Sequence, residues 1–203
     1  MRNVSALSAV FAVAFLAACS ESPSPAAKKK VEAPSAPISG RQALQYTFGS
    51  ARIWAPDSQP VSVRCTDLPE IKSEGGNSGA WEVVYVSEST GRARSYTWSA
   101  IETEGWHKGV FAGQQGTWNP SGPQKPFSPA LVKIDTPEAL EIANKASSEY
   151  LEKPGKRPPV SFALENSGRF QVPAWRVLWG GTVSSAEYFV TIDANTGKLL
   201  GKN

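Results

Sequence analysis

AWRVLWGGTVSSAEYFVTIDANTGKLLGK, residues 174–202, contains the pattern that decides the fold of this chain. In AWRVLW, residues 174–179, large side chains recur with a period of two, which places them on one face of a β-strand. YFVTID, residues 188–193, alternates in the same way and predicts a second strand. The Asp, Asn and Gly of residues 193–197 tolerate the left-handed backbone of a tight turn, so the chain reverses into a last short strand at 198–201. The stretch therefore predicts a three-stranded antiparallel meander.

The same design occurs earlier in the chain. Three pairs of segments match in the same order. The Ala-Leu pairs of two candidate helices start at residues 43 and 139. PVSVRC at residue 60 matches PVSFAL at residue 159, and AWEVVY at residue 80 matches AWRVLW at residue 174. The partners lie 94 to 99 residues apart. Matches in one order at similar offsets predict a duplicated unit, one helix followed by short antiparallel strands.

Each unit begins with a candidate helix that can cover its sheet. Ser39 can cap a helix over about residues 41–53, and Asp135 or Thr136 can cap a second helix that has Pro137 in its first turn. An amphipathic helix is a natural cover for a strand face rich in Trp. The expected helix-facing residues are Trp81, Val83, Tyr85, Trp175, Val177 and Trp179.

The fold class expected from these patterns is α+β, with two similar repeats at residues 41–111 and 135–203. The last strand of the first repeat is expected at residues 106–111, and a segment rich in Gly, Gln and Pro, residues 112–134, connects the two repeats. Val84 and Leu178 point away from the helices, so we expect the opposite sheet faces of the two repeats to meet each other.

Residues 1–18 have the features of a signal peptide. Arg2 precedes an apolar run at 9–18, which is too short to cross a bilayer as a helix. The run ends in Leu16-Ala17-Ala18-Cys19, which resembles the lipobox of bacterial lipoproteins. The resemblance implies that the chain is cut before Cys19 and that its thiol carries a diacylglycerol, so the lipid bilayer is the expected partner. An ordinary secretory signal, or a signal anchor, with an incidental cysteine is the alternative.

The segment after the cysteine indicates where the protein resides. Residues 19–40 are rich in Ser, Pro and Ala and predict a flexible tether. Ser20 follows the cysteine where an Asp would resemble an inner-membrane retention signal, so we expect a lipid-anchored envelope protein on the outer membrane, facing the periplasm. Without its signal the chain has a net charge of +2. This charge is too small to indicate a nucleic-acid partner.

Residues 136–202, and less closely residues 40–111, resemble the PepSY domain, so the resemblance implies two PepSY-like repeats in tandem. The resemblance is carried by a helix followed by a meander, and by Tyr-Phe-Val-Thr-Ile-Asp-Ala-Asn-Thr-Gly at 188–197, close to the family pattern Tyr-x-Val-x-(Val/Ile)-Asp-Ala-x-Thr-Gly. In the first repeat, Glu102-Thr-Glu-Gly105 stands in place of that turn. The resemblance implies a module that binds a protein or peptide, or inhibits a peptidase, with no catalytic residues of its own.

The residue types argue against an enzyme. His107 is the only histidine, there is no paired Cys motif, and no Gly-x-Ser-x-Gly elbow occurs. We therefore expect no catalytic residue, no metal site and no cofactor. A passive structural or assembly role in the envelope is the alternative, and a carboxylate-dependent hydrolase stays open because spatial pairs of carboxylates are not visible in a sequence.

Two aromatic residues in the 112–134 segment are candidate contacts for a partner. Trp118 and Phe127 could anchor an envelope protein or peptide; alternatively, they attach a long loop to the body. Cys65 is the only cysteine besides Cys19, and its position in an alternating strand predicts a small, buried apolar residue.

Overall fold

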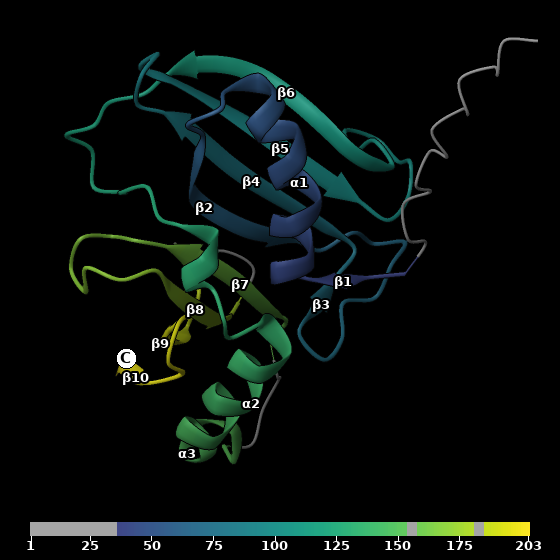
Figure 1. Cartoon of the computed structure of the whole chain (residues 1–203). Helices are drawn as coiled ribbons and strands as arrows, with labels where there is room; N and C mark the ends of the chain where they lie inside the picture. Colours follow the sequence, from purple (N-terminus) through teal and green to yellow (C-terminus); the bar gives the residue numbers. More distant parts are fainter. Residues whose placement is uncertain (1–35, 154–157, 181–184) are drawn as a thin grey trace, which may run out of the picture. The chain divides into compact units, whose positions relative to one another are not determined.

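A computed structural model describes residues 36–153, 158–180 and 185–203 of the chain (Figure 1). They form an α+β fold in which a large antiparallel sheet has its two longer helices on one face. In this part of the chain, none of the helices combines the length and hydrophobicity that a membrane span requires.

The described chain contains two longer helices, each followed by antiparallel strands. In chain order the elements are β1 (Ile38–Ser39), α1 (Gly40–Trp54), β2 (Gln59–Thr66), β3 (Asn77–Ser78), β4 (Ala80–Ser87), β5 (Arg92–Ser99), β6 (Gly109–Thr117), the short 3-10 helix η1 (Pro129–Leu131), α2 (Thr136–Ala146), α3 (Ser148–Leu151), β7 (Val160–Glu165), β8 (Ala174–Trp179), β9 (Tyr188–Asp193) and β10 (Leu199–Lys202).

The main sheet has eight strands in the order β10-β9-β8-β7-β2-β4-β5-β6. Its centre is the antiparallel pair β2–β7, in which Arg64 lies opposite Ala163 and Val63 lies opposite Leu164. The expectation that the faces carrying Val84 and Leu178 meet each other is therefore wrong. The two halves lie side by side because β2 and β7, which would otherwise be edge strands, satisfy each other's backbone hydrogen bonds.

The strands within each half pair in the same register. Trp81 lies opposite Trp98 and Val83 opposite Tyr96 in the β4–β5 pair. The β8–β9 pair places Trp175 opposite Ile192 and Val177 opposite Val190. Each partner in the second half is 94 positions after its counterpart in the first.

The core lies between this sheet and the helices, as the alternation predicts. All six expected helix-facing side chains of β4 and β8 are buried, and they belong to one apolar cluster with α1 and α2 residues. Each tryptophan also has a polar anchor, since Trp81 Nε1 donates to the Ile38 carbonyl at 3.0 Å and Trp175 Nε1 donates to the Ile134 carbonyl at 2.8 Å. The two indoles thus attach each sheet half to the segment that leads into its helix.

The N-termini of the two long helices meet at one carboxylate. Ser39 caps α1 and Asp135 caps α2, as predicted. Asp135 accepts hydrogen bonds from the Thr136 backbone N–H at 2.7 Å, from Ser39 Oγ at 2.6 Å and from the Arg41 backbone N–H at 3.0 Å. Gly40 allows this close approach, because a Cβ there would lie 2.5 Å from Trp175 Cη2.

The turn between β9 and β10 has the geometry that its sequence suggests. Asp193 accepts hydrogen bonds from the Asn195 backbone N–H at 2.8 Å and from Thr196 Oγ1 at 2.7 Å. Gly197 has a φ of 74°, a conformation that glycine adopts without strain. The Ala194 carbonyl accepts hydrogen bonds from the backbone N–H groups of Lys133 and Ile134, which joins the turn to the segment before α2.

Candidate functional site

The strand β6 lies at one edge of the main sheet, and most of its residues are exposed. It runs over nine residues, Gly109–Thr117, and pairs through one side only, with β5. Its sequence, GVFAGQQGT, contains no charged residue and no proline. Val110 and Phe111 are exposed at 38% and 45%. An edge strand without charge or proline is the arrangement on which another strand can add.

The position of β6 differs from the expected connection between repeats. The sequence predicts a last strand at 106–111 and a loop from 112, whereas the strand begins at Gly109 and continues to Thr117. It starts late because residues 101–108 form a turn, in which the Glu102 carboxylate accepts the Lys108 backbone N–H at 2.8 Å. It ends late because β5 offers pairing partners along its whole length, as far as Arg92 opposite Thr117.

Neighbouring side chains hold β6 in a defined shape. The register with β5 shifts between Arg94 and Tyr96, which marks a β-bulge. Arg94 Nε donates to the Gly113 carbonyl at 2.9 Å, and Trp54 Nε1 of α1 donates to Gln115 Oε1 at 2.7 Å. The edge is therefore preorganised, and binding along it would order few additional groups.

The two aromatic residues expected to contact a partner lie in different environments. Trp118 follows β6 directly, is half-buried, and its backbone N–H donates to the Gly91 carbonyl at 3.0 Å. Phe127 is only 3% exposed, belongs to the core cluster, and its backbone N–H donates to the Pro60 carbonyl at 3.0 Å. Phe127 thus attaches the loop to the body, and the expectation that it contacts a partner is wrong. The side chain of Trp118 stays partly accessible to a partner.

Sequence reasoning missed the exposed pair Val110 and Phe111. They were interpreted as the end of a strand, and their position on an outer strand depends on strand order, which alternation does not encode. A usable signal was present, since a neutral stretch without proline follows Lys108 for eleven residues, up to Pro120.

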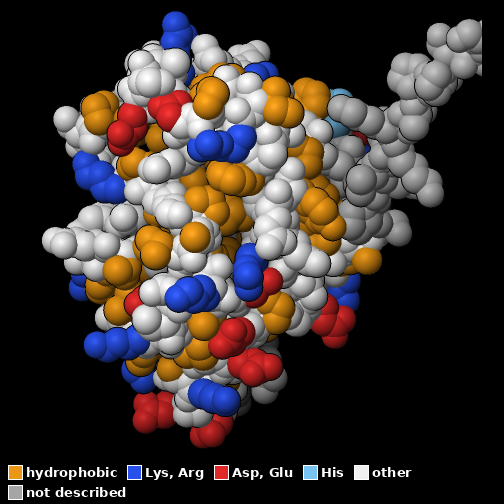
Figure 2. All heavy atoms as spheres, in the orientation of Figure 1, with side chains coloured by type: hydrophobic (Ala, Val, Ile, Leu, Met, Phe, Trp, Pro, Cys, Tyr) orange, Lys and Arg blue, Asp and Glu red, His pale blue; other side chains and the backbone are white. Residues whose placement is uncertain are grey.

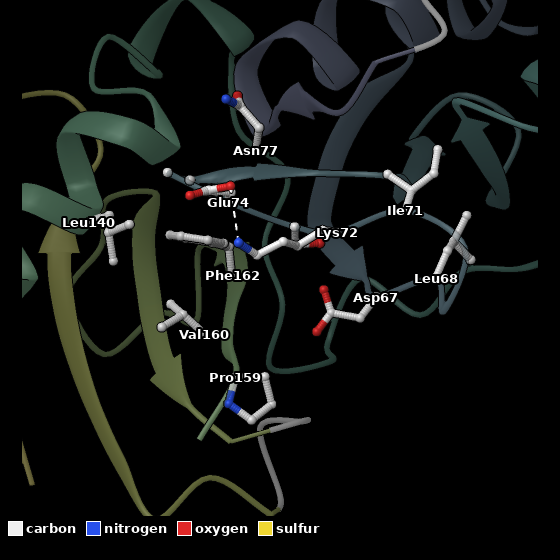
Figure 3. Close-up of a pocket in the computed structure, with 13 residues that line it drawn as sticks. Asp67, Leu68, Ile71, Lys72, Glu74, Asn77, Leu140, Pro159, Val160 and Phe162 are labelled. Carbon is white, nitrogen blue, oxygen red and sulfur yellow. Dashed lines mark hydrogen bonds and ion pairs between the residues drawn. The ribbon is translucent and has the colours of Figure 1, made fainter. Parts of the chain in front are cut away.

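A cavity of about 350 Å³ lies where the β2–β3 connection faces α2 and the start of β7 (Figure 3). Its apolar lining comes from Leu68, Ile71, Leu140, Val160 and Phe162. Lys72 and Glu74 stand at the rim with their charged groups 3.3 Å apart, and both side chains are largely exposed. Such a site has room for an uncharged apolar group, at the small end of the range for ligand pockets.

Cys65 lies on β2 next to this cavity. The residue is half-buried, and its Sγ accepts a hydrogen bond from the Phe162 backbone N–H at 3.0 Å. Burial of the sulfur raises the pKa of the Cys65 thiol to about 12, and the negative charge of Asp67 acts in the same direction. A thiol with this pKa is protonated at neutral pH and is a poor nucleophile.

We expect native Cys65 to react with iodoacetamide at pH 8 at least about a hundredfold more slowly than a free thiol, because its thiolate population is far smaller. In a Cys19→Ala chain, so that only Cys65 contributes, mass spectrometry measures the rate. The same chain in denaturant should react at the free-thiol rate. Equal rates before and after unfolding would contradict the burial of this sulfur.

Two carboxyl groups, those of Asp57 and Glu102, have a lowered pKa and are therefore ionised at neutral pH. Hydrogen bonds from the Ser89 backbone N–H and the Ser87 hydroxyl lower the pKa of Asp57 to about 2. The Lys108 backbone N–H and the His107 ring lower the pKa of Glu102. A general acid in carboxylate-dependent hydrolysis needs the opposite shift.

His107 lies in an exposed turn. Its Nδ1 is 2.8 Å from Glu102 Oε1, and its ring lies 4.3 Å from that of Phe111. Within residues 36–153, 158–180 and 185–203, no group of three or more His, Cys, Asp or Glu side chains is arranged to bind a metal. Cys19, the expected lipid attachment site, lies outside the described residues.

No protein-family model, curated protein or solved structure matches this chain.

Proposed function

We propose that this protein is a non-catalytic, membrane-tethered envelope lipoprotein that binds an extended segment of another envelope protein. The single observation that carries the proposal is the β6 edge, nine residues without charge or proline and with Val110 and Phe111 exposed. Natural edge strands are usually protected by lysine, by proline, by a β-bulge or by a covering element. Of these devices the residues of β6 supply a bulge but no lysine and no proline. A peptide that pairs with β6 would satisfy its free backbone groups, and Phe111 and the half-buried Trp118 would supply apolar contact.

The sequence motifs supply the cellular setting of this proposal. The lipobox-like Leu16-Ala17-Ala18-Cys19 supports a lipid anchor, and the segment up to residue 40 supports a tether. We propose an outer-membrane location facing the periplasm, because Ser20 follows the cysteine in place of the Asp that resembles an inner-membrane retention signal. A tethered module searches the envelope near its anchor, so a modest affinity for its partner is sufficient.

We also propose that the two halves of the fold are repeats. The β4–β5 and β8–β9 registers correspond residue for residue. The central pair β2–β7 supports the same view, because Arg64 and Ala163 are equivalent positions in the PVS segments and lie opposite each other. Equivalent residues that face each other are the mark of a two-fold arrangement.

Membership of the second repeat in the PepSY-like group is a proposal with similar support. The helix α2, the strands β7–β10 and the Asp193 turn follow the order that the resemblance implies. The implied inhibition of a peptidase would be one form of the proposed binding, with an extended segment of the peptidase as the strand that pairs with β6.

The proposal is tested by placing a charge on the edge. Phe111→Lys introduces the residue that natural edge strands use to prevent pairing. Affinity capture from solubilised envelope, quantified protein by protein, should find a partner whose recovery falls at least about tenfold, as expected when a central aromatic contact is lost.

The matched control is Leu199→Lys. Leu199 belongs to β10, at the other edge of the same sheet, and is 42% exposed, close to the value for Phe111. It adds the same charge and should leave recovery unchanged. Equal recovery with both variants would place the contact elsewhere, and no protein recovered above the empty matrix would favour the passive role.

A further inference from the structure

A second surface, on the helix side of the sheet, has a different chemistry from the β6 edge. It is formed by α1 and by η1 with the two residues after it, Val132 and Lys133, and is named here the α1–η1 face. A cavity of about 270 Å³ lies between these elements, with Leu44, Phe48, Pro129 and Val132 in its apolar lining. Figure 2, which views this side of the molecule, shows hydrophobic side chains in its centre with basic side chains, and some acidic ones, around them.

The charged side chains of the residues that define this face are all basic. The helix α1, GRQALQYTFGSARIW, contains two arginines and no acidic residue. Arg41 and Lys133 line the cavity, and Arg41 Nη1 donates to the Lys133 carbonyl at 3.3 Å, which keeps the two residues together. Arg52 lies 5.8 Å from the centre of the Phe48 ring. None of these three bases forms an ion pair in the described part of the chain.

One carboxylate lies close to two of these bases. Asp135 follows Lys133 by two positions and accepts a hydrogen bond from the Arg41 backbone N–H, so its negative charge offsets part of the positive charge at this end of the face. The side chains of the three bases form no ion pair with it, so the face keeps a net positive charge for an anionic partner.

Exposed apolar side chains accompany the bases on the same two elements. Ile53, in the last turn of α1, is 88% exposed, and Leu131 of η1 is 42% exposed. Single exposed apolar residues are common and need no explanation. Leu131 adjoins the residues that line the cavity, and Ile53 follows Arg52 at the far end of α1. Bases together with exposed apolar side chains are the composition of surfaces that lie on membranes.

We propose that the α1–η1 face docks on an anionic lipid surface. Arg41 and Arg52 are eleven residues apart on α1, roughly 16 Å along the axis. Charges spread over this distance fit an array of headgroups better than a single carboxylate or phosphate. Ile53 and Leu131 enter the boundary between headgroups and acyl chains, and the bases remain at the level of the headgroups. This inference does not depend on binding at β6.

The test uses a reporter on the face itself, so that insertion of the N-terminal segment does not contribute to the signal. An environment-sensitive fluorophore is attached to the purified chain at Ile53→Cys, with Cys65→Ala and Cys19→Ala to make the label specific. The chain is mixed with vesicles of phosphatidylcholine alone or with 30% phosphatidylglycerol. We expect a blue shift of the label only with the anionic vesicles, and reversal of the shift in high salt.

Two matched triple variants locate the effect. Arg41→Gln, Arg52→Gln and Lys133→Gln together should weaken the docking measured at position 53 about a hundredfold, since each base near an anionic surface contributes about a factor of five. Lys145→Gln, Lys153→Gln and Lys198→Gln remove the same charge from α2, the end of α3 and the β9–β10 turn, and should change docking much less.

Three results would overturn the proposal. These are an equal shift with neutral and anionic vesicles, full docking by the Arg41, Arg52 and Lys133 variant, and no shift with vesicles although polyglutamate produces one. The last result would make the α1–η1 face a site for acidic peptides. A circular dichroism spectrum of each variant confirms that the fold is intact before vesicles are added.

Discussion

Replacing Trp175 with alanine is expected to lower the free energy of unfolding by about 3–5 kcal/mol, as truncations of large buried aromatic residues do. The side chain is fully buried at the point where β8 meets the start of both helices. Its loss leaves a cavity beside Gly40 and removes the donor to the Ile134 carbonyl, which then lacks its partner. Trp81→Ala should have an effect of similar size, because Trp81 has the same position on β4 and the same kind of bond, to the Ile38 carbonyl.

Urea unfolding followed by circular dichroism measures this change. Trp118→Ala is the control, because Trp118 is only half-buried and its truncation should cost well under half as much. Trp175→Phe keeps most of the apolar contact and should cost less than the alanine variant. A loss below about 1 kcal/mol for Trp175→Ala would mean that the side chain is not part of the core, and the assigned strand phase would fail.

Asp135→Ala is expected to cost about 2–4 kcal/mol, more than a usual helix cap, because one carboxylate serves two helices. It caps α2 through the Thr136 N–H, and it also accepts the Arg41 N–H in the first turn of α1 and the hydroxyl of Ser39. The alanine variant leaves these donors without their acceptor at a partly buried junction.

Thermal and urea unfolding of three variants separates charge from geometry. Asp135→Asn keeps one acceptor oxygen and should cost less than alanine. Asp67→Ala removes the same charge at an exposed position and should stay within about 0.5 kcal/mol of the parent. A change of less than about 1 kcal/mol for Asp135→Ala would show that the two helices are joined by other contacts.

Local patterns predicted the elements of this fold well. Alternation in AWRVLW and AWEVVY identified the strand faces, because a period of two translates directly into burial on one side. The capping residues Ser39 and Asp135 were identified for the same reason, since a cap acts within three residues of itself. The α+β class followed from these two signals together.

The joining of the halves was predicted incorrectly, because it depends on pairing between distant strands. No local signal distinguishes β2 and β7 side by side from two sheets face to face, since both arrangements bury Val63 and Leu164. The extent of β6 was missed because Gly and Gln have low strand propensity, and this strand exists through its pairing with β5. The hydrogen bond between Ser39 and Asp135 joins residues 96 apart in sequence, so local patterns could not predict it either.

In the candidate site, too, the features that depend on contacts between distant residues could not be predicted from the sequence. Phe127 was one of two aromatic residues proposed as anchors, and its burial could not be inferred from a loop rich in Gly and Pro. Phe111 became a candidate only when β6 was found at the outer edge of the sheet. Deleting residues 116–127, which treats this region as a dispensable loop, would remove the end of β6 and a core residue, so single substitutions are the sharper test.

The central claim, strand addition on β6, is tested most directly by backbone hydrogen exchange. The partner identified by capture is bound to the chain, and exchange is compared with that of the free chain. If a strand adds to the edge, alternate N–H groups between Gly109 and Thr117 that face solvent in the free chain should exchange at least about tenfold more slowly in the complex, whereas those of β10 should not change. Unchanged exchange along β6 in a saturated complex would contradict the account.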